Sequence, residues 1–504
     1  MVMWSPVVRI PLIGQILEFG ISPVKMVQRC YEAYGPVYTV PVSYNVSCCI
    51  VSCYVVLCYC IAIICVFGIL LLSKSIPMLN AIVIHSFFKL QMGKVRMTFL
   101  IGPEAQEAFC KASDEVLSQD EVYEFMKPVF GPGVVYDATK KRRQVQFSSM
   151  ANGLRTSRLK GYVEKIEKET REFIADWGEE GELDLFKALS ELTILTASRC
   201  LHGNDVREQL FREVSELYHD LDHGLTPLTV FFPNAPTAAH KARNIARVKM
   251  VELFSKVIKS RRDDPAMSGS DGTDILSIFM EMKYKDGTDA TDEQVTGLLI
   301  ALLFAGQHTS CITSTWTSLF ICHNKQMKNR IMAEQKEVFD GDTAGKLDFD
   351  KLNNMQLLHD SMKEALRLRP PLILLIRKAV KDLKVKAGGR TYTVPKGDMV
   401  LISPTVGMRV PEVFKNPDMF DPDRFGPGRE EHKISPFGYL GFGGGMHSCM
   451  GQNFAFVQVK TILSILMREY DIEMVADELP DIDYTQMVVG PKGDCRIRYK
   501  RRIH

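Results

Sequence analysis

A cysteine in a glycine-rich loop near the end of the chain has the clearest potential for chemistry. Cys449 lies in the segment Phe442-Gly-Gly-Gly-Met-His-Ser-Cys-Met-Gly451, and residues 452–470 form an apolar run that predicts a helix. The small residues of the loop allow a flat, bulky group to approach the backbone closely. The amide groups at the start of the next helix favour a thiolate. These features predict a thiolate ligand for a haem iron, and the alternative is a buried, inert thiol.

A second segment predicts a buried helix that contains unusual polar residues. Thr291-Asp-Glu-Gln294 has the pattern of a capping box, in which the Thr and Gln side chains satisfy free amides at a helix start. Residues 295–304 are apolar on nearly every side, which is typical of a helix inside a large protein. Residues 306–310 are then small or polar, and unpaired buried polar groups are costly. Either this stretch has a functional role, or its polar groups form a kink satisfied by neighbours.

The composition is that of a large globular protein without a nucleic-acid partner. The chain has 504 residues, 46% hydrophobic residues and a net charge of +2. This length allows one large enzymatic domain or about two to four smaller domains. Basic residues are scattered rather than clustered, which argues against nucleic acid. The sequence has no dinucleotide-binding fingerprint, so electrons from NADPH would have to arrive through another protein.

The cysteines do not have the pattern of a secreted disulfide framework. Of the 13 cysteines, six lie in one apolar run and seven are scattered. The six are Cys48, Cys49, Cys53, Cys58, Cys60 and Cys65. We therefore expect reduced thiols on a cytosolic face.

Four segments together resemble the cytochrome P450 family. The loop around Cys449 matches the signature F-x-x-G-x-x-x-C-x-G, and Glu364-Ala-Leu-Arg367 resembles the E-x-x-R pair. Phe420-Asp-Pro-Asp-Arg-Phe425 resembles the aromatic–arginine segment, and Ala305-Gly-Gln-His-Thr-Ser310 resembles the oxygen-activating helix. The resemblance implies a mainly α fold with small β-sheets, formed as one catalytic domain over residues 1–504. It also implies haem b between a long central helix and the cysteine loop.

The form A-G-Q-H-T-S is similar to that of the sterol 14α-demethylases. In that family the histidine pairs with an aspartate from another helix and helps to relay protons. The matching residues here are His308 and Asp222, and a histidine suits such a relay. The resemblance further implies that Thr309 contacts O2, and that the helix opens locally at this point to hold water and oxygen.

Residues 121–137 resemble the signature of the same family for a loop over the haem. By this resemblance, Tyr123 and Tyr136 reach the haem propionates and Phe130 lines the cavity, where aromatic rings form a flat wall for a rigid steroid. Phe125 occupies the position at which plant and some protozoan members carry Phe, and these enzymes prefer sterols with one methyl group at C4. We therefore expect an obtusifoliol-like preference.

Other residues take roles only through the resemblance. The buried charge triad would consist of Glu364 and Arg367, which face the same side of a helix, together with Arg424. Haem contacts would come from Arg377, His447, Phe442 and Gly443 in addition to Cys449. The substrate wall would include Phe304, Ala305, Leu372, Ile376 and Met487, with Leu228 as a weaker candidate. Met446 replaces a frequent Arg or Lys, and Arg142 and Arg143 are candidates to supply the missing contact.

An apolar insertion interrupts the chain at about residues 43–92. Residues 46–72 carry no charge and exceed the length of a membrane-spanning helix. The insertion falls between segments 35–40 and 94–101, which we expect to pair as strands, and a single span would separate them. The insertion could be a re-entrant pair with residues 76–90, an apolar bulge on the membrane face, or a translated insertion in a mis-predicted gene. We favour the last.

The sequence therefore predicts a haem-thiolate monooxygenase that removes the 14α-methyl group of a sterol. The resemblance implies O2 and NADPH–cytochrome P450 reductase as partners, and an endoplasmic reticulum membrane location with the catalytic domain on the cytosolic face. The anchor that precedes residues 10–14 in microsomal members has no counterpart in the sequence. Two alternatives stay open: another haem-thiolate monooxygenase or isomerase, and a non-catalytic membrane protein with a disrupted fold.

Overall fold

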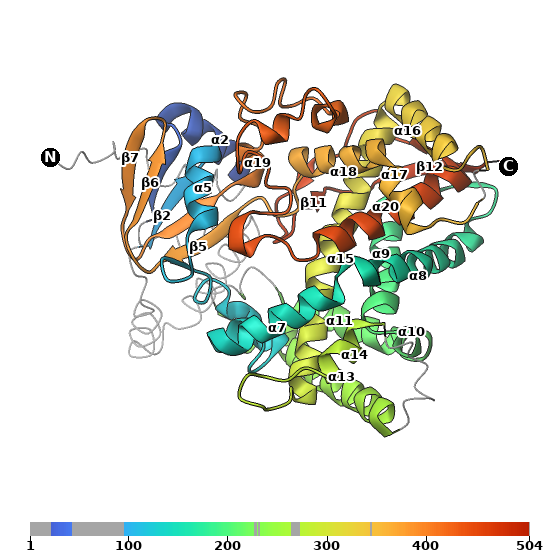
Figure 1. Ribbon diagram of the computed structural model, residues 1–504, viewed down its shortest axis with the longest axis horizontal. Coiled ribbons are helices and arrows are strands. Elements are labelled where there is room, and N and C mark those ends of the chain that lie inside the picture. Colours follow the sequence, from blue (N-terminus) through green and yellow to red (C-terminus); the bar gives the residue numbers. More distant parts are fainter. Residues whose placement is uncertain are drawn as a thin grey trace, which may run out of the picture.

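A helical body and a smaller β region make up the protein (Figure 1). The computed structural model describes residues 22–42, 95–225, 229, 232–263, 273–342 and 345–502. The helix α15 runs through the middle of the helical body, and the five-stranded sheet lies toward the N-terminal side (Figure 1). The expected mainly α fold with several small sheets is confirmed.

The helices have the following bounds. The α-helices are α2 Pro23–Tyr34, α5 Pro103–Lys111, α6 Lys127–Phe130, α7 Lys140–Gly153, α8 Thr156–Ile174, α9 Leu185–Leu201, α10 Asn204–Gln209, α11 Phe211–His223, α13 Ala238–Asp263, α14 Ile275–Met280, α15 Asp292–His323, α16 Lys325–Val338, α17 Phe349–Asn354, α18 Gln356–Leu368, α19 Pro404–Gly407 and α20 Gln452–Glu469. Short 3-10 helices are η1 Glu124–Met126, η2 Val135–Asp137, η3 Ala175–Trp177, η4 Pro422–Phe425, η5 Glu431–Lys433 and η6 Gly445–His447.

Strands form one larger sheet and three small ones. The strands are β1 Val37–Val42, β2 Val95–Leu100, β3 Leu117–Ser118, β4 Glu180–Asp184, β5 Leu375–Ala379, β6 Leu383–Ala387, β7 Arg390–Val394, β8 Met399–Ile402, β9 Tyr470–Met474, β10 Ile482–Asp483, β11 Gly490–Pro491 and β12 Arg496–Arg501. The larger sheet has the order β1-β2-β8-β5-β3, and the small sheets are β4-β12-β9, β6-β7 and β10-β11.

The two strands expected around the insertion do pair. β1 and β2 are antiparallel, with Val37 opposite Leu100 and Val42 opposite Val95. The chain therefore leaves and re-enters this sheet at neighbouring positions. The apolar insertion itself, at about residues 43–92, lies outside the described residues, as do Leu228 and the segment 10–14.

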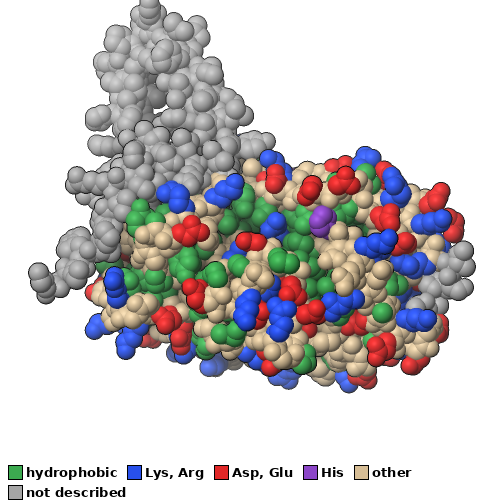
Figure 2. All heavy atoms as spheres, turned by 90° about the horizontal axis from the view of Figure 1, so that it is seen from above, with side chains coloured by type: hydrophobic (Ala, Val, Ile, Leu, Met, Phe, Trp, Pro, Cys, Tyr) green, Lys and Arg blue, Asp and Glu red, His purple; other side chains and the backbone are tan. Residues whose placement is uncertain are grey.

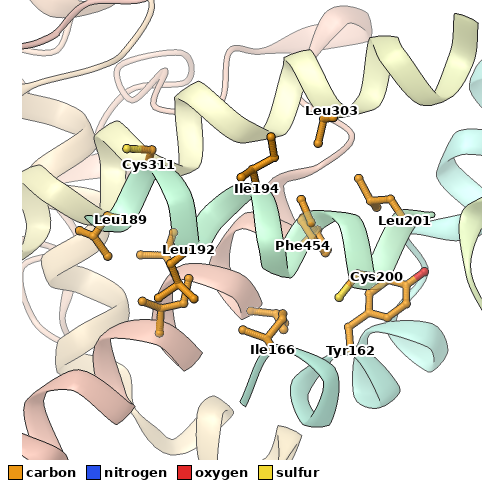
Figure 3. Close-up of a cluster of buried hydrophobic side chains, with 14 of the residues drawn as sticks. Tyr162, Ile166, Leu189, Leu192, Ile194, Cys200, Leu201, Leu303, Cys311 and Phe454 are labelled. Carbon is orange, nitrogen blue, oxygen red and sulfur yellow. The ribbon is translucent and has the colours of Figure 1, made fainter. Parts of the chain in front are cut away.

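The helix α15 forms the centre of the hydrophobic core. Thr291 and Gln294 form the expected capping box, with each side chain bonded to the other residue's backbone N–H. Figure 3 shows Leu303 and Cys311 of α15 beside Ile194 of α9, with Tyr162 and Phe454 beyond them. Among the described residues α15 is also the one helix long and apolar enough to cross a membrane, but most of its apolar stretch is buried in the protein.

The polar residues of α15 do not interrupt the helix, contrary to the alternative of a polar kink. The helix is continuous from Asp292 to His323. Thr309 donates to the carbonyl oxygen of Ala305 at 2.7 Å, and Thr313 and Thr317 continue this pattern one turn at a time. A hydroxyl that binds the carbonyl four residues earlier is satisfied without another element. This is why a buried helix tolerates so many Ser and Thr residues.

The expectation of reduced thiols agrees with the described part of the chain. Five of its cysteines, Cys110, Cys311, Cys322, Cys449 and Cys495, carry free thiols. The six cysteines of the apolar run lie outside the described residues.

A buried charge network joins α18 to the segment that leads to the cysteine loop. Arg367 makes two parallel hydrogen bonds to the carboxylate of Glu364, at 2.7 and 2.9 Å. Arg424 donates to the same carboxylate at 2.9 Å. All three side chains are fully buried, so the expected triad forms. Both arginines also donate to the carbonyl oxygen of Met419, which fixes the intervening turn.

The network contains a fourth buried charge, which the sequence analysis missed. Glu431 accepts from Arg424 at 2.5 Å and from Arg429 at 2.6 Å, and its side chain is almost fully buried. It also accepts from the backbone N–H of Lys415 at 3.1 Å. The guanidinium of Arg424 therefore lies between two carboxylates, which balances charges that would be costly to bury alone.

We predict that Glu431→Gln destabilises the fold, because it leaves Arg424 with one carboxylate in the interior. Removing one partner of a buried pair costs about 3–5 kcal/mol. Urea denaturation should show this loss of unfolding free energy, together with lower haem uptake during expression. The control is Glu430→Gln, since Glu430 is the preceding residue but pairs with Lys433 at the surface. Equal stability of the two variants would contradict the prediction.

Candidate functional site

The loop that carries Cys449 has a fixed shape and an accessible thiol. The backbone N–H of Cys449 donates to the carbonyl oxygen of Phe442 at 2.8 Å, and the N–H of Gly443 donates to that of Leu440 at 3.0 Å. Gly443 has a φ of 69°, which favours glycine. The side chain of Cys449 is exposed, and α20 begins three residues later. The loop therefore leaves the thiol of Cys449 accessible to the haem that the sequence analysis predicted.

Gly445 brings this loop against the C-terminal end of α5. A Cβ atom at position 445 would lie 2.0 Å from the carbonyl oxygen of Cys110, and the φ of Gly445 is 69°. Any other residue would push the loop away from α5. Two further contacts meet the same helix end. Arg377 donates to the carbonyl oxygen of Phe109 at 2.7 Å, and His447 Nε2 lies 2.7 Å from Asp114 Oδ1.

Two effects act on the acidity of Cys449 in the polypeptide. Desolvation by neighbouring protein atoms raises the pKa of the Cys449 thiol, although the residue is exposed overall, and the backbone N–H of Gly451 opposes this shift. The expected thiolate therefore belongs to the haem-bound protein. Deprotonation would have to come with metal binding, since a coordinating thiol loses its proton to the metal.

One face of α15 is open where the remainder of the helix is packed. Ala305 is exposed, and no atom lies within 4 Å of the position that a Cβ would take at Gly306. Thr309 lies one turn further on and is also accessible, whereas Leu303 is buried. Small residues on an accessible helix face fit a flat group and a small molecule such as O2.

Arg377 fits the carboxylate end of a haem. Its side chain is only 3% exposed, it lies over the ring of Phe109 at 4.3 Å, and its Nε has no hydrogen-bond partner. Burial lowers the pKa of Arg377, while Cys110, Asp114 and Tyr123 oppose this shift. A buried guanidinium with an unused donor is suited to an anionic group. The residues present therefore fit haem propionates.

The two tyrosines expected at the propionates lie together. Tyr123 and Tyr136 stack with ring centroids 5.1 Å apart. Burial raises the pKa of Tyr123, and the charge of Arg377 opposes the shift, so the phenol lies near that guanidinium. Burial likewise raises the pKa of Tyr136, and here Arg143 opposes it. Both phenols keep their protons and can donate hydrogen bonds.

An unusual backbone conformation shapes the loop that carries Tyr136. Val135 has a φ of 44°, which is rare for a β-branched residue. Gln146 accepts from the N–H of Val135 at 2.9 Å, and Arg143 donates to its carbonyl oxygen at 2.8 Å. Arg143 also pairs with Asp120. Arg143, which lies on α7, therefore holds the loop around Val135 in place.

Two of the polar residues considered for the haem contacts, Arg142 and His447, already have partners in the protein. Arg142 pairs with Asp286 at 3.0 Å, and Met446 itself is exposed. His447 pairs with Asp114, and burial and the charge of Arg377 lower its pKa, while Asp114 opposes the shift. His447 lies close enough to Arg377 for their charges to interact, but its hydrogen-bond partner in this structure is Asp114.

Aromatic side chains form a continuous row from the loop to α15. Tyr123 lies 6.1 Å from Phe125, and Tyr136 lies 6.2 Å from Phe130, measured between ring centroids. Phe130 in turn meets Phe304 of α15 edge-on at 6.3 Å. Phe125 and Phe130 are buried. The structure thus brings five of the predicted residues into one apolar wall.

Three other wall candidates belong to the C-terminal half of the chain. Leu372 and Met487 are 43% and 44% exposed, which is unusual for large apolar residues. Their segments are joined, since the N–H of Val489 donates to the carbonyl oxygen of Pro371 at 2.9 Å. Ile376 lies on β5 opposite Leu401 and is partly buried.

His308 and Asp222 come together from two helices. His308 Nε2 of α15 lies 3.0 Å from Asp222 Oδ1 of α11. The side chains are 32% and 29% exposed, so water reaches the pair. This geometry allows a proton to pass between solvent and the open face of α15.

Several residues with clear contacts had no role in the sequence analysis. Tyr218 of α11 and Gln307 of α15 form a hydrogen bond of 3.0 Å beside the His308–Asp222 pair. Tyr218 is four residues before Asp222, which places both on one helix face and was the available signal. The sequence offered no signal for Asp114, because its partner His447 is far away in the sequence. It offered none for the burial of Glu431, because burial depends on the folded chain.

Comparisons with known proteins agree with this geometry. The family described as Cytochrome P450 matches the chain over residues 73–497. A sterol 14-demethylase of Arabidopsis thaliana is 48% identical, covering 83% of this chain and 85% of the relative. An obtusifoliol 14-alpha demethylase of Sorghum bicolor is 42% identical over 98% and 89%, and a lanosterol 14-alpha demethylase of Bos taurus is 37% identical over 98% and 86%.

A solved structure has the same fold. The retinoic acid-bound cyanobacterial CYP120A1 superposes with a TM-score of 0.74 at 18% identity, and the match covers 98% of each chain. The cysteine loop, the open face of α15 and these similarities lead to one conclusion. The chain belongs to the cytochrome P450 family, within the group that includes the sterol 14-demethylases.

Proposed function

We propose that this protein is a sterol 14α-demethylase that uses haem b. The observation that carries the proposal is the accessible Cys449 loop in a chain that also brings His308 of α15 to Asp222 of α11. Relatives that cover most of the chain are named sterol, obtusifoliol and lanosterol 14-demethylases. The reaction removes the 14α-methyl group in three oxidations of one carbon, through an alcohol and an aldehyde to formate.

The haem is held by residues from four segments. Cys449 supplies the thiolate ligand, and Phe442 and Gly443 shape its loop. Arg377, Tyr123 and Tyr136 provide buried donors for the propionates, with His447 beside them. When bound, the haem supplies O2 activation and the oxidation of the substrate carbon.

The polypeptide contributes binding, orientation and protons. The aromatic row from Phe125 to Phe304 presents a flat apolar surface to the sterol, and Ala305 leaves space beside it. We assign Leu372, Ile376 and Met487 to the same sterol site, supported by the exposure of the large apolar side chains of Leu372 and Met487. A rigid sterol held in one position returns the same carbon to the reactive centre in each round.

Protons reach the site from water through charged and hydroxyl groups. Asp222 accepts the hydrogen bond of His308, and histidines accept and release protons near neutral pH. Thr309 Oγ1 now donates to Ala305, and rotation of this hydroxyl presents it to the open face. In our proposal these three residues supply the protons that each round consumes.

The redox partner and the location follow from the same function. We assign NADPH–cytochrome P450 reductase as the electron donor, docking on the side of the Cys449 loop, where Met446 and Met450 are exposed. An endoplasmic reticulum membrane suits an apolar sterol substrate, with the catalytic domain on the cytosolic side. On the face drawn in Figure 2, basic and acidic side chains are interspersed.

We predict that Cys449→Ala abolishes haem binding and demethylation. The measurement is the carbon-monoxide difference spectrum of the reduced protein, followed by conversion of obtusifoliol with a reductase. Cys322→Ala is the control, since Cys322 is a free thiol at the far end of α15. Haem uptake and sterol oxidation by Cys449→Ala would refute the proposed function.

We predict a preference for sterols with one methyl group at C4, set by Phe125. The side chain is buried in the aromatic row, so its bulk cannot move aside easily. Phe125→Leu should relax the preference by roughly 10- to 200-fold at most, the range for one methyl group in an apolar pocket. The measurement is the ratio of kcat/KM for obtusifoliol and lanosterol. Equal turnover of both sterols by the unmodified enzyme would contradict the assignment.

A further inference from the structure

The helix α11 reaches α15 through side chains at two points. Its backbone packs mainly along α13. The first point is Tyr218, whose hydroxyl donates to Gln307 Oε1 at 3.0 Å and whose ring lies 4.6 Å from that of Phe304. The second point is Asp222, which meets His308 one turn later. The position of Asp222 therefore depends on how firmly α11 is held.

The two points differ in their surroundings. Tyr218 is 3% exposed and Gln307 is 6% exposed, so their hydrogen bond is shielded from water and uncharged. Asp222 and His308 are both partly open to solvent. A shielded neutral hydrogen bond does not change with proton transfer, whereas the strength of an aspartate–histidine contact depends on the proton.

Gln307 is fixed from a second direction. Its Nε2 donates to Ser190 Oγ of α9 at 3.3 Å. The amide thus links α9, α11 and α15, and it belongs to the residue directly before His308 in the chain. Any shift of α11 that breaks the Tyr218 bond leaves the buried Gln307 oxygen unpaired, which is costly.

We infer that Tyr218 and Gln307 are positioning residues for the His308–Asp222 pair. They keep α11 seated on α15 during the moments when His308 exchanges a proton and its bond to Asp222 weakens. Asp222 then stays within reach of His308 for the next proton transfer. This inference rests on the proposed function, in which the pair supplies protons.

Tyr218→Phe tests the inference because it removes the hydroxyl and keeps the ring against Phe304. The expected result is a roughly 2- to 10-fold fall in the fraction of consumed NADPH recovered as formate, the range for one hydrogen bond. Sterol-induced changes in the haem spectrum should persist. Hydrogen exchange of residues 211–223 in the haem-loaded protein without sterol should become faster.

The matched control is Tyr162→Phe, which removes another fully buried hydroxyl, bonded to the Gly153 carbonyl oxygen at 3.2 Å on α7. It should leave NADPH coupling and α11 exchange unchanged. Gln307→Met removes the same bond together with the bond to Ser190, so its effect should equal or exceed that of Tyr218→Phe. The double variant should match Gln307→Met, because the two changes share the Tyr218 bond.

The outcomes separate the inference from the proposed function. If Tyr218→Phe matches the unmodified protein in both coupling and α11 exchange, the inference is overturned. If the two single variants give fully additive losses, it is overturned as well. If the unmodified enzyme demethylates no sterol, the proposed function fails, while faster exchange in Tyr218→Phe alone would still support the α11–α15 contact.

Discussion

The carboxylate of Glu364 is the interaction on which the rest of the structure depends. It accepts from Arg367, from Arg424 and from the backbone N–H of Asp421, and the side chains of Glu364 and both arginines are fully buried. Such a set is stable only when it is complete, so it fixes α18 relative to the segment 419–431. From there the chain runs directly to the cysteine loop. Tyr439 donates back to the carbonyl oxygen of Lys363 at 3.1 Å, which ties the loop's beginning to α18.

The helix α15 presents the residues that we expect to take part in the reaction. The helix α15 keeps its regular backbone because its hydroxyl side chains use carbonyl groups of the preceding turn. It can therefore present small and ionisable residues at one place without losing its own hydrogen bonds. Rigid elements on both sides restrict a flat cofactor and a rigid sterol to one arrangement, and this restriction makes repeated oxidation at one carbon feasible.

Local patterns in the sequence predicted the features that depend on neighbours along the chain. The capping box at Thr291, the same-side placement of Glu364 and Arg367, and the strands at 37–42 and 95–100 are of this kind. Contacts between residues that are far apart in the sequence were not predictable from one sequence without a family pattern. The contact of His447 with Asp114 and the hydrogen bond of Tyr218 with Gln307 both depend on tertiary packing. The burial of Glu431 was missed for a related reason, since burial is a property of the folded chain.

The C-terminal end of α5 acts as a common reference for the cofactor pocket. Arg377 binds the carbonyl oxygen of Phe109, Gly445 rests on that of Cys110, and His447 meets Asp114 just beyond the helix. Because one short helix end supports all three, a thermal displacement of α5 carries the propionate anchor and the thiolate loop along together. Their mutual spacing is therefore set by one structural element. The pocket thus tolerates movement of its frame better than three independently supported anchors could.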